Sequence, residues 1–202
     1  MAHGPRFRVK FRRQREGKTD YRYRLRQLKS ERPRAVVRFT NRRVLVSLEE
    51  FDPKGDRILV QAESPELVAV GFPSSSLTST PAAYLTGYLA GLRLAAKGPK
   101  EAVLDAGVLR PSKGGRILGA LQGLLDAGVD VPHSKDGLPP KERLGGAHLK
   151  TPLPQPLDQY RQKVSSSLVT KAAKAPSTPK APKPAPAPGS SSGGSARPGA
   201  SP

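Results

Sequence analysis

The sequence predicts an α/β fold with one mixed sheet, in the order β-β-β-α-β-α, and with helices packed on at least one face of the sheet. Two patterns predict this order. Three short segments with apolar residues at every second position come first, and two longer segments of helical period follow, separated by a brief apolar run. The distribution of charge then divides the 202 residues into a basic N-terminal arm at residues 1–34, a core at residues 35–150 and a low-complexity tail at residues 151–202.

Alternation of apolar residues predicts the three strands. Their inward sets are Ala35, Val37 and Phe39, then Val44, Val46 and Leu48, then Ile58, Val60 and Ala62. Residues 40–43 and 52–56 connect these strands, and the second connection contains a proline and a glycine, which are typical of turns. Two short connections in succession predict an antiparallel meander.

A long helix is predicted to follow. We expect Thr80 to cap it, with Pro81 at its first position, and Gly98 to end it. Its apolar residues recur at helical spacing, at Leu85, Leu89, Leu92 and Ala96. Gly87 and Gly91 are one turn apart and lower helix propensity, so we expect another backbone to approach closely there.

The remaining core residues complete the order. Residues 102–104 are apolar and follow a crossover helix, which predicts a strand parallel to an earlier one. Ser112 is expected to open a second helix, and Gly128 to end it. Residues 139–145 are expected to add one short helix. The tail holds 11 of the 22 prolines, so it should be disordered when the protein is free.

The composition excludes several kinds of site and favours one kind of partner. The net charge is +19, which favours a polyanion such as nucleic acid. The absence of cysteine excludes disulfides, iron-sulfur clusters and thiolate zinc sites. No apolar run is long enough to span a bilayer, and residues 1–29 lack the apolar stretch of a secretory signal. From this composition we expect a soluble, intracellular protein, and we expect no membrane, cofactor, metal or small-molecule substrate.

The arm carries the strongest functional pattern. It holds 13 Lys and Arg against three acidic residues, a net charge of +10, whereas the core has +3 and the tail +6. The cations of residues 6–18 are interleaved with Phe7, Val9 and Phe11, which favours binding of phosphates and stacking on unpaired bases. A solubilising or localisation segment is the alternative. From Thr19 the arm should be helical, with an apolar stripe docked on the core and a basic stripe facing phosphates. The two stripes are Tyr21, Leu25 and Leu28, and Arg22, Arg26 and Lys29.

Three loops offer further phosphate contacts. The turn at residues 41–43, with Arg38 on the strand beside it, places three guanidinium groups and an amide at a sheet edge, although charged turns are also common without a function. Residues 74–80 and 110–116 precede the two helices, whose N-termini favour anions, and ordinary capping explains both loops equally well. Residues 110–116 lack the spacing of a nucleotide-binding G-x-x-x-x-G-K-[ST] loop.

An enzyme would need clustered carboxylates or a nucleophile beside a base. The predicted order resembles that of ribonuclease H-like nucleases, and Asp105, Asp126 and Asp130 lie near the ends of predicted elements. Glu49 and Glu63, however, fall on the face opposite the apolar sets, so the first three strands carry no inward acid. The three histidines are far apart in the sequence.

Three long blocks carry a resemblance to a known family. They are PRFRVKFRRQREGKTDYRYRLRQLKSERPRAVVRFTNRRVLV, STPAAYLTGYLAGLRLAAKG and EAVLDAGVLRPSKGGRILGALQGLLDAGVDVPHS. From about residue 4 to about residue 149 the chain resembles the archaeal and eukaryotic-type large-subunit ribosomal proteins that bind 5S rRNA, the universal ribosomal protein family L eighteen. The tail from about residue 151 matches no part of that family.

The resemblance implies a mixed α/β fold and a non-catalytic structural protein of the ribosome. It further implies that the protein anchors 5S rRNA to the large-subunit rRNA in the central protuberance and meets neighbouring ribosomal proteins. A free RNA-binding assembly factor and, behind it, a nuclease are the alternatives. Carried over by position, the implied RNA contacts are Arg6, Arg8, Lys10, Arg12, Arg13, Arg15, Lys18, Arg22, Arg26, Arg38, Asn41, Arg42, Arg43, Lys113 and Arg116.

Overall fold

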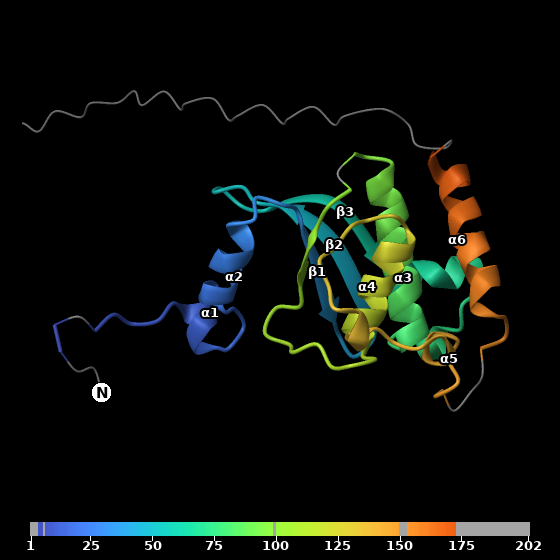
Figure 1. Cartoon of the computed structure of the whole chain (residues 1–202), viewed down its shortest axis with the longest axis horizontal. Coiled ribbons are helices and arrows are strands. Elements are labelled where there is room, and N and C mark those ends of the chain that lie inside the picture. The colour runs from blue at the N-terminus through green and yellow to red at the C-terminus, as the bar shows by residue number, and fades with distance from the viewer. Residues whose placement is uncertain (1–3, 6, 99, 150–152, 173–202) are drawn as a thin grey trace, which may run out of the picture.

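The protein folds around a four-stranded mixed sheet that is covered by helices on one face (Figure 1). The computed structural model describes residues 4–5, 7–98, 100–149 and 153–172. The strand order is β3-β2-β1-β4, with β1 and β2 antiparallel, β2 and β3 antiparallel, and β4 parallel to β1. The strands are β1 (Arg34–Phe39), β2 (Val44–Glu50), β3 (Arg57–Glu63) and β4 (Val103–Asp105). The predicted fold class, including the parallel fourth strand, is confirmed.

A register shift in the sheet changes one predicted inward residue. Leu48 pairs with Val60, but the next residue, Glu49, pairs with Ile58, so the ladder is irregular at this point. A bulge of this kind reverses the alternation of side chains beyond it. Ile58 is therefore 54% exposed instead of buried, whereas Val60 and Ala62 face the core as predicted.

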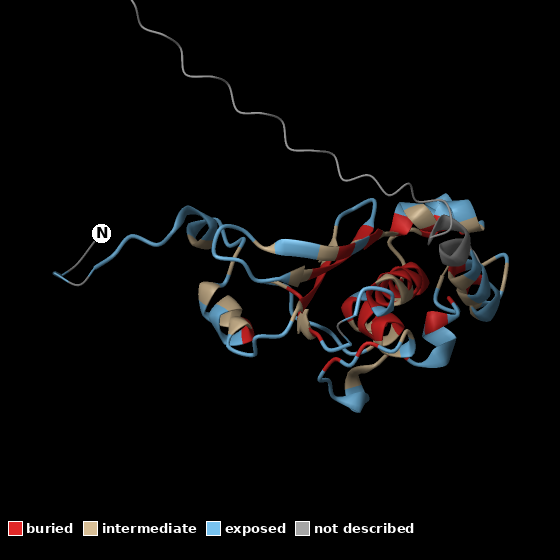
Figure 2. Ribbon diagram, turned by 90° about the horizontal axis from the view of Figure 1, so that it is seen from above, coloured by how far each residue is buried: buried red, intermediate tan, exposed pale blue. Residues whose placement is uncertain are grey.

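Helices α3 (Thr80–Ala95) and α4 (Arg116–Asp126) form the layer next to the sheet, and α3 lies at the centre of the molecule. Helix α3 contacts β2, β3, α4 and α6 (Leu157–Ala172), so most of its residues are buried (Figure 2). Neither helix begins at the predicted residue: α3 begins at Thr80, one residue earlier than predicted, and α4 begins at Arg116, later than the predicted start at Ser112. The cap of α3 is Ser79, whose side chain accepts from the amide of Ala82, and α4 begins after Gly115 because residues 112–115 form a turn.

Short 3-10 helices and one short α-helix connect these elements. The 3-10 helices are η1 (Ser64–Val70), η2 (Ser74–Ser76) and η3 (Lys135–Gly137). The short helix expected within residues 139–145 is confirmed as α5 (Lys141–Leu144). Within the described residues, no helix is long and apolar enough to cross a membrane.

Glycines allow α3 and α4 to cross in backbone contact. A Cβ atom on Gly87 would lie 2.1 Å from the carbonyl oxygen of Ala120, and one on Gly91 would lie 2.5 Å from the Cβ of Ala127. Gly123 of α4 is in the same position toward α3, because its Cβ would lie 2.1 Å from the carbonyl oxygen of Tyr84. The close approach predicted for Gly87 and Gly91 is confirmed, and Gly123 is its counterpart on the second helix.

Replacing Gly123 by alanine should therefore destabilise the protein. The added methyl group collides with backbone atoms of α3 that cannot move without separating the helices, so we expect a loss of about 2 kcal/mol or more. Gly145→Ala is the control, because its Cβ would lie 3.4 Å from the nearest atom and its φ of −68° is ordinary. Urea unfolding measures both variants. Equal stabilities would show that the crossing tolerates a methyl group.

The C-terminal segment contains an element that the sequence analysis did not predict. Helix α6 lies within residues 151–202, which were expected to be a disordered tail, and it packs on α3. Tyr160 and Val164 are fully buried, and the Tyr160 ring lies 5.3 Å from that of Phe72. The prediction of a tail without packed structure is therefore wrong for this helix. The expected disorder of residues 173–202 concerns positions outside the described residues.

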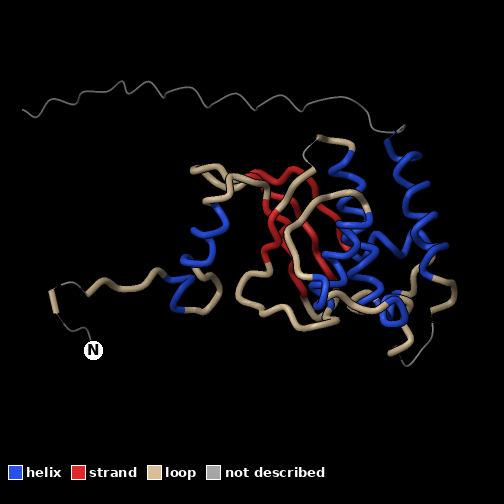
Figure 3. Tube along the Cα trace, in the orientation of Figure 1, coloured by secondary structure: helices blue, strands red, loops and turns tan. Residues whose placement is uncertain are grey.

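The arm forms two short helices beside the sheet, α1 (Arg12–Arg15) and α2 (Tyr21–Leu28) (Figure 3). The second begins at Tyr21, two residues later than predicted, with Asp20 as its cap. Its predicted docking face is wrong, however, because Leu25 is 59% exposed and the buried residue is Gln27. The helix docks on the sheet through polar side chains instead of through its apolar stripe.

Candidate nucleic-acid interface

A buried arginine organises the sheet face that lies opposite the helices. Arg34 is only 2% exposed. It donates hydrogen bonds to Asp105 (2.8 Å) and Asp56 (2.5 Å), and a longer one of 3.4 Å to Glu49. By its position in the sequence, Arg34 is one of the 13 cations of the arm. Its charge is instead neutralised inside the protein, where a buried charge requires partners.

The same carboxylates hold the arm helix in place. Arg24 of α2 donates two hydrogen bonds to Asp56, at 2.7 and 2.8 Å. Gln27 donates to the carbonyl oxygen of Leu104 at 2.9 Å, and the Tyr23 hydroxyl donates to the same oxygen at 3.4 Å. Burial and the negative charge of Asp105 raise the pKa of Tyr23, so its hydroxyl stays protonated and can donate. Polar contacts to β4 and to the β2–β3 hairpin thus fix the position of α2.

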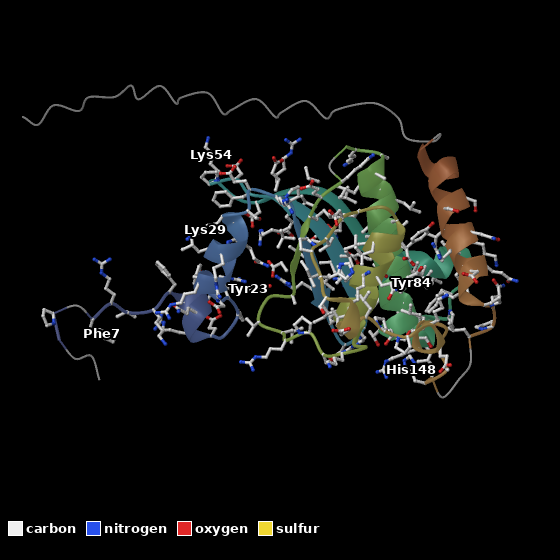
Figure 4. The ribbon with its side chains drawn as sticks, in the orientation of Figure 1. Phe7, Tyr23, Lys29, Lys54, Tyr84 and His148 are labelled. Atoms are coloured by element: carbon white, nitrogen blue, oxygen red, sulfur yellow. The ribbon has the colours of Figure 1, made fainter. Side chains whose placement is uncertain are left out.

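Most cations that the sequence analysis assigned to RNA are exposed on the arm. Seven of them precede or lie on α1 and the turn after it, and two lie on α2. Arg6 is outside the described residues. The exposed cations are Arg8, Lys10, Arg12, Arg13, Arg15, Lys18, Arg22 and Arg26. Phe7 and Phe11 are also exposed, and Figure 4 shows Phe7 on the extended part of the arm, away from the sheet.

The few contacts that these cations make inside the protein are weak. Glu16 pairs with Arg12 at 3.7 Å and with Lys18 at 2.8 Å, and all three side chains are exposed. Such surface ion pairs contribute about 0 to 1 kcal/mol. Replacing Glu16 by a phosphate as the partner of these cations therefore costs little free energy, and the exposed face of the arm favours a polyanion.

Arg38 has a partly structural role that the sequence analysis missed. Its guanidinium donates to the carbonyl oxygens of Asp105 and Val37, at 2.9 and 3.0 Å, and forms an ion pair with the Asp105 carboxylate at 3.3 Å. The side chain is 40% exposed. It therefore belongs to the internal network while remaining partly exposed to solvent.

A second group of predicted residues meets at the end of β1. Asn41, Arg42 and Arg43 form the exposed turn between β1 and β2, and Arg43 pairs with Glu63 at 2.8 Å on the surface. Arg116, from the start of α4, lies 4.8 Å from the ring centre of Phe39, the last residue of β1. Lys113 is exposed on the turn before α4. The structure thus brings the turn and the helix start to one end of the sheet.

The acids that raised the possibility of a nuclease are not arranged for one. Both carboxylate oxygens of Asp105 accept hydrogen bonds from arginines, and one also accepts the amide of Gly107 at 2.7 Å. Asp126 accepts from the Tyr84 hydroxyl at 2.6 Å, and burial with this contact raises the pKa of Tyr84. Among the described residues, no group of three or more His, Cys, Asp or Glu is placed to hold a metal ion.

The sequence is similar to known proteins over most of its length. It matches the family described as ribosomal large subunit proteins 60S L5, and 50S L18, over residues 5–101 and 94–134. A large ribosomal subunit protein uL18 from Korarchaeum cryptofilum is 50% identical over 149 residues, which cover 74% of this chain and 76% of the relative. The uL18 protein of Methanoculleus marisnigri is 48% identical over 155 residues, 77% of this chain and 88% of the relative. The uL18 protein of Methanococcus maripaludis is 45% identical over 171 residues, 83% of this chain and 88% of the relative.

Proposed function

The chain belongs to the family of large-subunit ribosomal proteins that comprises 60S L5 and 50S L18, and from this premise we propose that it binds 5S rRNA and anchors it to the large-subunit rRNA in the central protuberance. Membership makes the protein an rRNA-associated structural constituent of the large ribosomal subunit in the cytoplasm, and not an enzyme. The proposal goes beyond family membership because it names the RNA that the protein binds and the surface that binds it.

The observation that carries the proposal is the exposure of the arm cations, two of which, Arg22 and Arg26, lie on a helix that is itself fixed on the core. Arg24 and Arg34 form ion pairs with carboxylates inside the protein, whereas the cations of α1 and of the outer face of α2 are exposed to solvent. Fixed cations contact phosphates with little loss of conformational freedom. The proposed neighbours are other proteins of the same subunit.

Titration of the purified chain with 5S rRNA tests the proposal. At equal salt concentration we expect binding to 5S rRNA to be at least about 10³ times tighter than binding to a tRNA, the lower end of the ratio seen for specific DNA-binding proteins. Equal affinity for the two RNAs would leave only general attraction to a polyanion, and would refute the proposal. This comparison also separates it from an assembly factor without preference for 5S rRNA.

The exposed turn between β1 and β2 should contribute to binding without contributing to folding. Replacing both Arg42 and Arg43 by alanine should change stability by no more than about 0.5 kcal/mol per residue, because the one ion pair lost is exposed. Two lost phosphate contacts at about 1.5 kcal/mol each should weaken 5S rRNA binding by roughly two orders of magnitude at low salt. A thermal melt and an RNA titration measure the two effects.

The matched control removes two cations from the other hairpin. Lys54 and Arg57 are exposed at the β2–β3 connection, at the opposite end of β2, and no RNA contact is proposed for them. Their double alanine variant loses the same charge. If it weakens binding as much as the Arg42 and Arg43 variant does, the β1–β2 turn has no specific contact and only total charge matters.

A further inference from the structure

Two adjoining pockets lie where the arm meets the core. The first has a volume of about 120 Å³, far below the roughly 300 to 1,000 Å³ of small-molecule sites. It lies between the α1–α2 connection and the ends of β1 and β4. Its charged lining residues are Arg13, Lys18, Arg24, Arg38, Asp20 and Asp105.

The lining of this polar pocket holds four cations against two carboxylates, and both carboxylates already accept hydrogen bonds. Asp20 is occupied by the amides of Arg22 and Tyr23, and Asp105 is occupied by two arginines and the amide of Gly107. Arg13 uses only its Nε, which donates to Thr19 at 2.9 Å. In the described part of the chain, the terminal nitrogens of Arg13 make no hydrogen bond. A guanidinium with two free parallel donors is suited to a phosphate.

The second pocket is larger and more apolar. It has a volume of about 370 Å³ and is lined by the loop of residues 106–111 together with Asp20 and Tyr23. Asp20, Tyr23 and Gly107 also line the polar pocket, so the two pockets adjoin. Val108 and Leu109 are 55% and 53% exposed, and the hydrophobic core does not include them. Arg110 and Pro111 complete the wall.

We propose that the two pockets together hold one unpaired nucleotide of the bound RNA. The phosphate is placed in the polar pocket, against Arg13, Lys18 and the partly exposed side chain of Arg38. The base is placed against Val108 and Leu109, with the Arg110 guanidinium available for stacking. Sequence-specific recognition of RNA generally uses bases turned out of loops and bulges, because the bases of an A-form duplex are inaccessible to side chains. The inference rests on the proposed binding of 5S rRNA and names one site within it.

The nucleotide would also join the arm to the core. Arg13 and Lys18 belong to the arm, whereas Arg38 and the loop after β4 belong to the sheet. A ligand that contacts both sides favours the docked position of α2 by its differential affinity for that position. Binding at this site thus orients the other arm cations toward the RNA.

The phosphate half is tested by comparing Arg13→Ala with Arg15→Ala. Both residues are exposed on α1, but only Arg13 lines the pocket. We expect Arg13→Ala to weaken 5S rRNA binding about tenfold or more, as loss of a charge-assisted hydrogen bond does, and Arg15→Ala about twofold. Ethylation interference should show one phosphate whose modification weakens binding of the wild type but not of the Arg13 variant.

The base half is tested by a photoreactive residue in place of Leu109, with one in place of Val68 as the control. Val68 is also exposed and apolar, but it lies on η1. We expect position 109 to crosslink to one unpaired nucleotide of 5S rRNA, adjacent to the phosphate found by interference, and position 68 to give no such product.

Three outcomes overturn the inference while leaving the proposed function intact. They are equal losses for Arg13→Ala and Arg15→Ala, a crosslink from position 109 to a base-paired nucleotide, and no crosslink from position 109 to 5S rRNA. In each case wild-type binding to 5S rRNA persists. Failure of the proposed function is distinct, because the wild-type chain would then show no preference for 5S rRNA.

Discussion

Deletion of residues 1–18 should flatten the salt dependence of 5S rRNA binding by about 3 to 5 units in the slope of log K against log salt, if about five of its cations meet phosphates. The deletion removes seven Lys and Arg and the exposed rings of Phe7 and Phe11. It leaves α2 in place, because that helix is fixed by Arg24 and Gln27, which lie beyond the cut. The slope therefore reports lost phosphate contacts and not a displaced core.

Removing cations elsewhere on the surface separates the effect of the arm from that of the total charge. The control replaces four exposed cations outside the proposed interface with glutamine, at Lys54, Arg57, Lys100 and Lys135. We expect its slope to stay within about one unit of the wild type, since these residues should contact no phosphate. If the deletion variant has the wild-type slope, the arm does not anchor the RNA, whatever affinity for 5S rRNA the variant keeps.

Asp105→Asn should destabilise the fold by about 3 kcal/mol or more. Arg34 is almost fully buried, and Asp105 is the partner that lies deepest beside it. Removing the carboxylate charge leaves the Arg34 guanidinium with only Asp56 and the more distant Glu49, and it also removes the ion pair of Arg38. The loss of a buried partner is severe because the remaining charge stays desolvated.

Chemical unfolding by urea measures this loss, with Asp136→Asn as the matched control. Asp136 is exposed on the short helix η3, so the same chemical change should alter stability by about 0.5 kcal/mol at most. Similar stabilities of the two variants would mean that Arg34 does not depend on Asp105. The structural role given to this network would then be wrong.

The sequence patterns that predicted the structure correctly are those that have a single physical cause within a short segment of the chain. Alternation in β1 and β2 follows from burial of one sheet face, and both inward sets are buried or packed against the core. Gly87 and Gly91 were informative because few other reasons place two glycines one turn apart within a helix. Ile58 failed because nothing in the sequence marks the bulge between β2 and β3.

The arm helix shows why periodicity alone cannot identify a docking face. Leu25 belongs to the apolar stripe but is exposed, and the face that docks carries Tyr23, Arg24 and Gln27. Polar residues recur along a helix at the same spacing whether their face docks on the protein or lies in solvent. Its partners, Asp56 and the carbonyl of Leu104, are 32 and 77 residues away from Arg24 and Gln27, so the sequence could not pair them.

Helix α6 was missed for a different reason. The prediction averaged composition over residues 151–202, in which prolines dominate. Within that range, Leu157, Tyr160 and Val164 recur at helical spacing, and the last two are buried. A shorter window would have detected this helix, so the signal was present in the sequence.

Crosslinking the protein to RNA in cells, followed by sequencing of the recovered RNA, tests the central claim most directly. We predict that the recovered RNA is mainly 5S rRNA and large-subunit rRNA, and that the 5S crosslinks map to the arm and the β1–β2 turn. Recovery mainly of other RNAs, or 5S rRNA crosslinks confined to surfaces away from the arm and this turn, would contradict the account.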